Sequence, residues 1–263
     1  MEALEEVAGS IRVRHIETAA AELFCAEPGL RSAEARRVMF ERGFTQAPVV
    51  DGVGISGFIL RGDLAEVDDA VGFKIRGLDR NVLVSADTPL GGLLPLLAQV
   101  RFGEPAFYFV LEGHVVTGLV TRSDLNKESA RAYFFVRLAS LERRVNERLR
   151  RAYPDDGYLG FLEADQREKI QRRHRQASSL DLDVPLACYL DFPDLLMIAG
   201  RTPEIRMDLG ATNEEAWLRT TQQFDELRNR VSHAPRDIID SKLDIEQLVD
   251  LDRRLTALAA RAG

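Results

Sequence analysis

The sequence has few of the residues that build disulfide frameworks or metal centres. Its 263 residues include two cysteines, which lie far apart and form no CxxC pair, and four histidines without HxxxH or HExxH spacing. This pattern supports neither a disulfide framework nor a zinc site. We therefore predict a protein that works without a metal ion.

A long apolar run is also missing. No stretch reaches the ~18 consecutive apolar residues that suggest a membrane-spanning helix. The first ten residues, MEALEEVAGS, are acidic, whereas a signal peptide is basic and then apolar. We therefore expect a cytoplasmic protein with no membrane association. Hydrophobic residues make up 45% of the chain and charged residues 29%, which is ordinary for a globular protein and enough to fill a core.

Length and charge give two further expectations. At 263 residues the chain exceeds a typical single domain of ~100–150 residues, so two domains are expected. The net charge is −7, but arginines cluster in the second half. The clusters are Arg143, Arg144, Arg148, Arg150 and Arg151, then Arg172, Arg173 and Arg175. A solvated helix face is the simplest explanation of such runs, and a polyanion such as RNA is the alternative.

Two segments of the first half repeat one another. Residues 45–64 read TQAPVVDGVGISGFILRGDL, and residues 103–125 read GEPAFYFVLEGHVVTGLVTRSDL. Each contains an apolar run, a turn with glycine, a second apolar run and a polar step into Asp-Leu. Asp63 and Asp124 are 61 residues apart, and Gly57 and Gly118 have the same separation. A shared offset at two landmarks indicates an internal repeat.

The composition of each repeat predicts its secondary structure. The runs APVVD and AFYFVLEG favour strands, each followed by the second strand of a hairpin. Before the first hairpin, RSAEARRVMFERGF predicts a helix with Ser32 as N-cap and Gly43 at its end. The corresponding TPLGGLLPLLAQVRFG is a poorer helix because its glycines and Pro95 disfavour one. Each unit is therefore predicted to be β-α-β-β-α.

This element order, the period and the final T-x-x-D-L step resemble the cystathionine-β-synthase-type (CBS) domain, here as a tandem pair (a Bateman module). The resemblance covers residues 1–125, and residues 126–263 are expected to form a second domain. It implies an α+β fold for the first domain and an adenosine-type regulatory ligand, such as AMP, ADP, ATP or a related nucleotide.

The resemblance also implies where that ligand binds. Residues Gly118 to Asp124 match the family pattern in full, so Asp124 is expected to accept the ribose hydroxyls, with the Thr121 hydroxyl on the same rim. A strand that enters a helix near Ser123 also directs backbone N–H groups and a positive helix end at a phosphate. Further candidate contacts are Ala47, Ala106 and Phe107 beside adenine, Arg61 and Arg122 beside phosphate, and Asp63 in the first repeat.

The first repeat departs from the pattern, because Leu60 stands where the hydroxyl belongs. We therefore expect one occupied cleft per chain, at Thr121 and Asp124. Two alternatives remain open at this point. Asp63 and Asp124 are also suited to cap helices, a common role of aspartate, and some CBS pairs bind nothing and serve as dimerisation surfaces.

From Asn126 onward the sequence favours helices. The apolar residues Phe134, Leu138, Leu141, Val145 and Leu149 fall on one helical face. Further helices are predicted around residues 160–178, in 185–200 with an interruption at Pro193, from the N-cap Asn213 to Pro235, and over 243–261. Short connections between them predict an all-α antiparallel bundle.

One of these helices contains Arg228-Asn229-Arg230-Val231-Ser232-His233. An Arg, a polar residue and a His five positions after the Arg resemble the R-x4-H motif of the HEPN superfamily, all-helical domains that include many metal-independent ribonucleases. The resemblance implies catalytic roles for Arg228 and His233, with Asn229 as the accompanying polar residue. Histidine can remove the proton of an RNA 2′-hydroxyl, and a guanidinium can stabilise the charge on the phosphoryl group.

Helix geometry adds a condition. Residues five apart on a helix point ~140° away from each other, so a site made from two copies of the motif at a dimer axis is more favourable, and a homodimer is predicted. The alternative is that Arg228 and His233 only stabilise the helix C-terminus. Glu142 is a possible assistant at the site, Trp217 is expected in the core, and His174 is expected to face solvent.

Together these features predict an adenine-nucleotide-sensing regulatory protein whose HEPN-like domain cleaves RNA without a metal. The alternative is a non-enzymatic adaptor that binds a partner protein through its helices in a nucleotide-dependent way. A role in nucleotidyl transfer, known for some HEPN proteins, would require a second protein.

Overall fold

The computed structural model of the chain describes residues 2–64, 69–180, 182, 184–233, 235–241 and 243–261. The chain forms two compact units. The sheet unit consists of Gly9–Ala130 and Ser241–Glu246, and the helical unit consists of Met1–Ala8, Arg131–Asp240 and Gln247–Gly263. Each unit is therefore assembled from segments that are distant in sequence, whereas the sequence suggested one boundary after residue 125.

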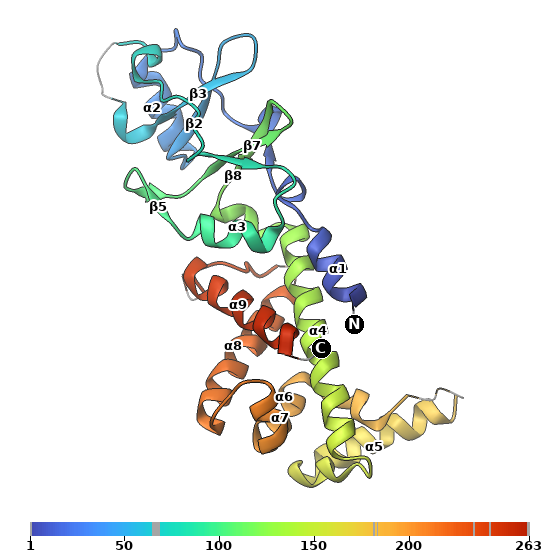
Figure 1. The fold of residues 1–263 in the computed structure, drawn as a ribbon. Coiled ribbons are helices and arrows are strands. Elements are labelled where there is room, and N and C mark those ends of the chain that lie inside the picture. The colour runs from blue at the N-terminus through green and yellow to red at the C-terminus, as the bar shows by residue number, and fades with distance from the viewer. Residues whose placement is uncertain are drawn as a thin grey trace. The chain divides into compact units, whose positions relative to one another are not determined.

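The two hairpins of the sheet unit are the predicted ones (Figure 1). In the first repeat, β2 (Gln46–Val50) pairs with β3 (Ile55–Leu60); in the second, β7 (Tyr108–Glu112) pairs with β8 (Val115–Val120). A four-stranded sheet has the order β1-β8-β7-β4, with β1 (Thr18–Ala19) antiparallel to β8 and β4 (Leu83–Ser85) parallel to β7. The short strands β5 (Val100–Arg101) and β6 (Glu104–Pro105) pair with each other.

The register repeats with the sequence. Val49 pairs with Gly57 in the first hairpin, and Val110 pairs with Gly118 in the second, so each hairpin lies at the 61-residue offset from the other. Both glycines are required by a close backbone approach. A Cβ added at Gly57 would lie 2.6 Å from the Arg76 carbonyl oxygen, and one added at Gly118 would lie 2.3 Å from the Thr18 carbonyl oxygen.

Helix α2 (Ser32–Glu41) precedes the first hairpin, and α3 (Leu90–Leu97) precedes the second. The N-cap of α2 is Arg31, so Ser32 is its first helical residue and not the cap that the sequence predicted. Gly43 follows the helix with φ +71, as its expected role at the end of the helix requires. Helix α3 forms although it contains Pro95, because four of its leucines are buried in the core.

An aromatic core joins the two repeats. The rings of Phe58, Phe107 and Phe109 lie with centroids 5.4–6.0 Å apart, and the same cluster contains Leu60. Leu60 is 4% exposed. The leucine that replaces the expected hydroxyl of the first repeat therefore serves the core between the repeats.

Single turns of 3-10 helix complete the sheet unit: η1 (Val13–His15), η2 (Ala20–Glu22), η3 (Arg61–Asp63), η4 (Val71–Lys74) and η5 (Arg122–Asn126). The elements of the helical part of the chain are α1 (Glu2–Ser10), α4 (Glu128–Ala152), η6 (Gly157–Phe161), α5 (Ala164–Ser178), η7 (Leu186–Tyr189), α6 (Phe192–Arg201), α7 (Pro203–Asp208), α8 (Glu214–Ser232) and α9 (Ile245–Arg261).

The helix boundaries follow from local chemistry. The five apolar residues predicted to share a face of α4 are all buried. The Asn213 side chain accepts a hydrogen bond from the Ala216 N–H at 2.8 Å and caps α8 as predicted. Pro193 lies in the first turn of α6, so it starts a helix there and does not interrupt one.

Packing and buried polar groups hold the helical unit together. Trp217 is 2% exposed, as predicted, and its Nε1–H donates to the Leu196 carbonyl at 2.7 Å. Gly200 permits this contact between α6 and α8, because a Cβ there would lie 2.2 Å from the indole. Helix α1 is held by Glu5, whose carboxylate accepts hydrogen bonds from Arg137 at 2.7 Å and Ser140 at 2.8 Å.

Candidate functional site

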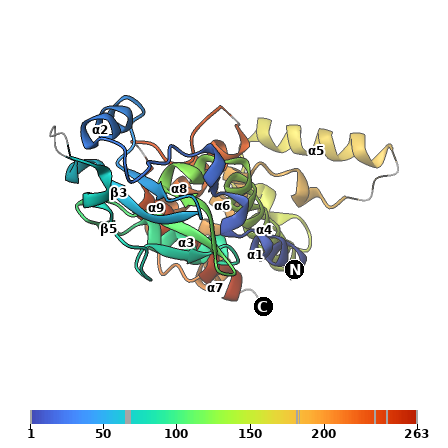
Figure 2. The same ribbon diagram turned by 90° about the horizontal axis from the view of Figure 1, so that it is seen from above.

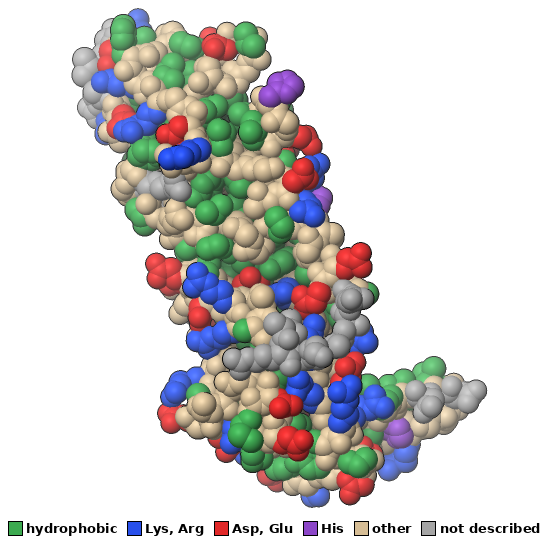
Figure 3. Space-filling view, viewed as in Figure 1, with side chains coloured by type: hydrophobic (Ala, Val, Ile, Leu, Met, Phe, Trp, Pro, Cys, Tyr) green, Lys and Arg blue, Asp and Glu red, His purple; other side chains and the backbone are tan. Residues whose placement is uncertain are grey.

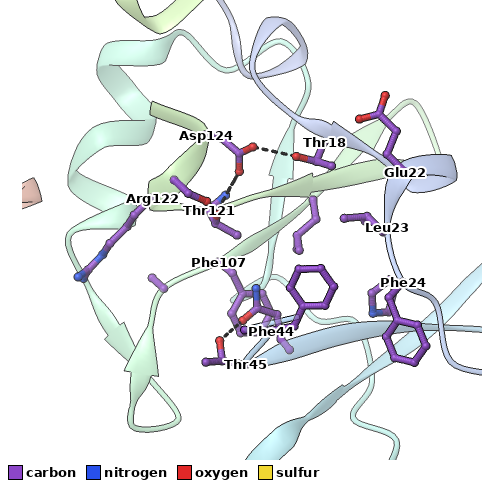
Figure 4. A pocket seen from close by; sticks show the side chains of 16 residues that line it. Thr18, Glu22, Leu23, Phe24, Phe44, Thr45, Phe107, Thr121, Arg122 and Asp124 are labelled. Carbon is purple, nitrogen blue, oxygen red and sulfur yellow. Dashed lines mark hydrogen bonds between the residues drawn. The ribbon is translucent and has the colours of Figure 1, made fainter. Parts of the chain in front are cut away.

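A cavity of about 360 Å³ lies in the sheet unit, within the size range of small-molecule sites. Its walls come from both repeats and from the segment before the first one (Figure 4). The lining residues are Thr18, Glu22, Leu23, Phe24, Gly43, Phe44, Thr45, Gln46, Pro48, Ala106, Phe107, Leu119, Thr121, Arg122, Ser123 and Asp124. The structure thus brings five of the predicted contacts, Ala106, Phe107, Thr121, Arg122 and Asp124, to one cavity.

Asp124 is the charged centre of this site and is 5% exposed. Its Oδ1 accepts from the Thr18 hydroxyl at 2.8 Å and pairs with the Lys127 ammonium at 2.8 Å. Its Oδ2 accepts from the Thr121 N–H at 2.7 Å and the Thr121 hydroxyl at 2.9 Å (Figure 4). Because a carboxylate offers about four acceptor positions, all of them are taken by groups of the protein itself.

Lys127 connects Asp124 to the chain segment before the first repeat. Besides Asp124, its ammonium donates to the carbonyl oxygens of Ile16 at 2.8 Å and Glu17 at 2.9 Å. The lysine therefore links the end of the second repeat to the segment that precedes the first one. The ammonium also donates to the Thr18 hydroxyl at 2.9 Å, so four acceptors surround a group that has three donors.

The helix expected from Ser123 is replaced by η5, a short 3-10 helix that ends before α4 begins. Thr121 and Asp124 form a reciprocal capping box at its start, so the capping role that was considered for Asp124 is present. The Thr121 N–H donates to Asp124 and is occupied, and a five-residue 3-10 helix provides little dipole. The expected helix start is therefore a single 3-10 turn, and contact of its backbone with a phosphate stays a prediction.

Arg122 points away from the apolar side chains of the cavity (Figure 4). Its guanidinium donates to the carbonyl oxygens of Leu97 at 2.8 Å, Gln99 at 3.1 Å and Ala98 at 3.2 Å. In this structure Arg122 stabilises the C-terminal end of α3, where unpaired carbonyls attract cations. Contact of Arg122 with a phosphate stays a prediction.

Apolar and aromatic groups line the rest of the cavity. Ala106 and Phe107 are each 1% exposed, whereas Phe44 is 36% exposed and can contact a ligand. Two other predicted contacts are not among the lining residues: Ala47 is 1% exposed, and Gly118 packs against the Thr18 carbonyl. The cavity therefore combines apolar and aromatic side chains with two carboxylates, those of Asp124 and Glu22, and with polar groups that include Thr45 and Gln46.

The first repeat places a different group beside its aspartate. The Nε–H of Arg76 donates to Asp63 Oδ2 at 2.7 Å, and the Arg76 guanidinium lies 4.9 Å from the centre of the Phe102 ring. Arg61 lies elsewhere, over the Phe40 ring at 5.8 Å, beside a second cavity that it shares with Arg36 and Arg37. Asp63 and Arg61 are thus not brought together with the Asp124 cavity.

Several residues of these sites were missed from the sequence, among them Thr18, Phe44, Arg76 and Lys127. Thr18 and Arg76 lie in segments that share no residue pattern. The signal that relates them is strand pairing, because Thr18 pairs with Leu119 and Arg76 pairs with Phe58 at the same 61-residue offset. Lys127 follows Asp124 by three residues, a helical spacing that could have suggested the pair.

The R-x4-H motif spans the last turns of α8. Arg228 is half-buried, with its guanidinium 5.5 Å from the centre of the Phe192 ring. Burial raises the pKa of the Glu142 carboxyl, and the charge of Arg228 opposes that rise. His233 is exposed and is the C-cap residue of α8, and Asn229 donates to Asp225 at 3.4 Å. Although Arg228, Asn229 and His233 all lie within the described residues, no hydrogen bond or ion pair joins Arg228 to His233.

The buried arginine of this helix is Arg230, which the motif did not single out. It is 6% exposed and pairs with Glu226 at 2.8 Å and Asp240 at 2.9 Å. Arg131 on α4 donates to the carbonyl oxygen of the same residue. Arg230 therefore fixes the end of α8 to the following segment.

The basic stretches of the helical unit carry mixed charge. On the face seen in Figure 3, Lys and Arg side chains of this unit lie among Asp and Glu side chains and form no uninterrupted patch. Helix α5 extends to the side of its unit in both ribbon views (Figures 1 and 2). Its Lys169 and Arg173 pair with Asp191. His174 on α5 is half-buried, and its ring contacts that of Tyr189, so the expectation of a solvent-facing histidine is only partly met.

The described residues form neither a metal-binding cluster nor a helix that could span a membrane. No group of three or more His, Cys, Asp or Glu side chains there is placed to hold a metal ion. Within the same ranges, no helix combines the length and apolarity needed to cross a membrane.

No protein-family model matches the sequence, and no curated protein matches it. Solved structures of similar fold exist. An uncharacterised conserved protein from Pyrococcus horikoshii is 22% identical and matches over 44% of this chain and 90% of its own, with a TM-score of 0.37. The CBS-pair protein CBSX2 from Arabidopsis thaliana is 19% identical over 47% of this chain and 94% of its own, with a TM-score of 0.38. The CBS domain of a bacterial CNNM/CorC family Mg²⁺ transporter in complex with ATP is 21% identical over 50% of this chain and 95% of its own, with a TM-score of 0.37. Two of these three structures are described as CBS proteins, and each of the three matches covers about half of this chain.

Proposed function

We propose that the sheet unit is a CBS pair that binds one adenosine nucleotide, such as AMP, ADP or ATP, and that the protein is a nucleotide-sensing regulator. The observation that carries this proposal is the position of Asp124. Its buried carboxylate lines the same cavity as the aromatic side chains of Phe44 and Phe107, and two of its four partners are threonine hydroxyls.

The two threonine hydroxyls match the chemistry of a ribose. Thr18 and Thr121 each donate one O–H to the Asp124 carboxylate, and the 2′- and 3′-hydroxyls of a ribose offer the same pair of donors. On binding, the threonine side chains rotate and the ribose hydroxyls take their places. The backbone N–H of Thr121 and the Lys127 ammonium keep the carboxylate oriented throughout the exchange.

The apolar walls suit the base. Phe44, Leu23 and Phe107 line the cavity next to Asp124, and flat apolar surface of this kind favours a purine ring. The described lining holds one cation, Arg122, which is turned toward α3. We therefore infer that recognition rests on the adenosine moiety more than on the phosphates.

The test is isothermal titration calorimetry of the full chain with AMP, ADP, ATP and adenosine. We expect one nucleotide per chain, and Asp124→Ala is expected to lose ~1–3 kcal/mol of binding energy, or ~5- to 150-fold in affinity. Asp63→Ala is the matched control and should bind as the wild type does. Because Asp124 also caps η5, Asp124→Asn and a thermal unfolding curve are included to separate lost binding from lost structure. Wild-type protein that binds no adenosine compound would overturn the proposal.

For the helical unit we propose metal-independent cleavage of RNA as a second candidate function, in an obligate homodimer. What supports it is the R-x4-H resemblance together with the exposure of His233 at the end of α8. His233 would handle the proton of the 2′-hydroxyl and Arg228 the phosphoryl charge. The position of Arg228 against Phe192 supports equally the alternative of a non-enzymatic adaptor, in which these residues only stabilise the helix.

An RNA cleavage assay distinguishes these two functions. Cleavage should persist in EDTA, leave a 2′,3′-cyclic phosphate, and fall by ~10²-fold or more in His233→Ala, the usual scale for a general acid–base group. Exposed His114, in the sheet unit, provides the control variant His114→Ala. If the protein cuts no RNA with or without adenine nucleotides, the adaptor hypothesis replaces the ribonuclease. Light scattering tests the homodimer, and a monomer at micromolar concentration would count against both the dimer and the catalytic site.

A further inference from the structure

Arg76 occupies in the first repeat the place that Thr18 occupies in the second. Thr18 pairs with Leu119 in the β1–β8 ladder, and Arg76 forms an antiparallel bridge with Phe58, the residue 61 positions before Leu119. The bridge is closed by two hydrogen bonds, from the Phe58 N–H to the Arg76 carbonyl at 3.0 Å and from the Arg76 N–H to the Phe58 carbonyl at 2.8 Å. The segment that contains Thr18 and the segment that contains Arg76 are therefore equivalent by hydrogen-bond register. We call them the crossing segments of the two repeats.

The repeat glycines identify the same equivalence independently. The nearest backbone atom to a Cβ on Gly118 is the Thr18 carbonyl oxygen, and the nearest one to a Cβ on Gly57 is the Arg76 carbonyl oxygen. The side chains complete the match, since Thr18 donates to Asp124 and Arg76 donates to Asp63. Both repeats thus present one side chain from a crossing segment to the aspartate at the end of the second hairpin strand.

The two side chains differ greatly in size and charge. Thr18 leaves beside Asp124 a cavity whose wall includes Phe44, from the segment between α2 and β2. Arg76 reaches past Asp63 to the ring of Phe102, from the segment between α3 and β7. Its guanidinium therefore makes the two kinds of contact, a carboxylate hydrogen bond and an aromatic face, that the proposed site offers to a ribose and a base.

We propose that Arg76 is a built-in occupant of the first repeat's nucleotide site and limits the protein to one adenosine nucleotide per chain. This inference rests on the proposed nucleotide-binding function. It locates the cause of the single site in one arginine. The Leu60 substitution lies in the core between the repeats and is not needed to explain it.

The test is the number of nucleotides bound by Arg76→Thr, the variant that copies the residue of the second repeat. Equilibrium dialysis with AMP should give one equivalent for the wild type and two for Arg76→Thr. Adding Asp63→Asn to Arg76→Thr should return the value to one, because the second ribose loses its carboxylate. Arg80→Thr, which removes an exposed arginine from the same segment, is the matched control and should bind one.

The outcomes separate this inference from the function on which it rests. One equivalent in both wild type and Arg76→Thr would overturn the role of Arg76 and leave the Asp124 site standing. No binding in the wild type would overturn the proposed function itself. Two equivalents in the wild type, reduced by Arg76→Thr, would show that Arg76 binds a nucleotide instead of excluding one. If Arg76→Thr unfolds, Arg76→Gln keeps a hydrogen-bond donor for Asp63 and should still admit the second equivalent.

Discussion

The two repeats of the sheet unit share a backbone plan and differ in what lies beside their aspartates. The hairpins have matching registers, and the crossing segments pair at equivalent positions. In the second repeat a threonine hydroxyl contacts Asp124 and leaves a cavity, whereas in the first an arginine contacts Asp63. The comparison supports our proposal that an internal repeat keeps the backbone plan of a site, while the side chain beside the aspartate, Thr18 or Arg76, decides whether a ligand is admitted.

The largest effect is expected when the side chain beside Asp124 is replaced by the one that lies beside Asp63. Thr18→Arg places a guanidinium beside Asp124, as Arg76 lies beside Asp63. Affinity for AMP, measured by calorimetry, should fall by ~10²-fold or more, or ~2.7 kcal/mol. Thr18→Val, which removes the hydroxyl without adding bulk, is the control and should change affinity far less. Unchanged binding by Thr18→Arg would mean that the crossing position does not decide occupancy.

The repeat glycines provide a second comparison. Gly57→Ala and Gly118→Ala each drive a methyl group into the backbone of a crossing segment, and each should lower the free energy of unfolding by ~1–3 kcal/mol. Gly118→Ala should also weaken AMP binding because it displaces Thr18, and Gly57→Ala should not. Gly62, which has open space where a Cβ would be, provides the control variant Gly62→Ala. Denaturant unfolding and calorimetry measure both effects, and equal binding losses at the two glycines would contradict the comparison.

The smallest expected effect is a pH dependence of stability caused by Glu17. Glu17 lies directly before Thr18, whereas the equivalent position before Arg76 is the apolar Ile75. Burial raises the pKa of the Glu17 carboxyl and Glu112 adds to the rise, while the Thr117 hydrogen bond, Lys127 and Arg14 oppose it. A raised pKa means that the folded state binds the proton more tightly than the unfolded state, so this contribution to stability is lost as pH rises through the folded-state pKa.

Glu17→Gln should therefore raise the melting temperature relative to the wild type at pH 8, and the difference should vanish at pH 4. Thermal unfolding followed by circular dichroism across this range measures it. Glu112→Gln, at an exposed position of the same sheet, should show a smaller dependence. A gain that persists at pH 4 would show that ionisation of Glu17 is not its cause.

The sequence predicted the repeats, their hairpins and the position of Asp124, because strand alternation and the 61-residue offset are local signals. It did not predict Thr18 or Arg76 at the sites, because these residues reach them through pairing with strands from distant parts of the chain. The helix expected at Ser123 is a 3-10 turn that begins with the Thr121–Asp124 capping box, and residue patterns do not distinguish such a turn from the start of an α-helix.

In the helical unit, too, local features were predicted from the sequence and contacts between distant segments were not. The apolar stripe of α4 and the cap at Asn213 followed from spacing and residue type. Glu142 was considered as an assistant of Arg228, and the two side chains do interact electrostatically, but the contact of Arg228 with Phe192 was not predicted, because Phe192 comes from another helix. Arg230 escaped notice for a similar reason, since Asp240 reaches it only after the chain has turned back.

The helical unit is assembled from segments that are distant in sequence, and this affects the order in which the chain folds. Helix α1 is synthesised before α4, and the α4 arginine that binds Glu5 follows it 132 residues later and the serine 135 residues later. The β2–β3 hairpin, by contrast, closes over a short loop. Local contacts form early and distant ones slowly, and chains fold as they emerge during synthesis. The first repeat can therefore fold on the ribosome before α4 has been synthesised and can bind α1.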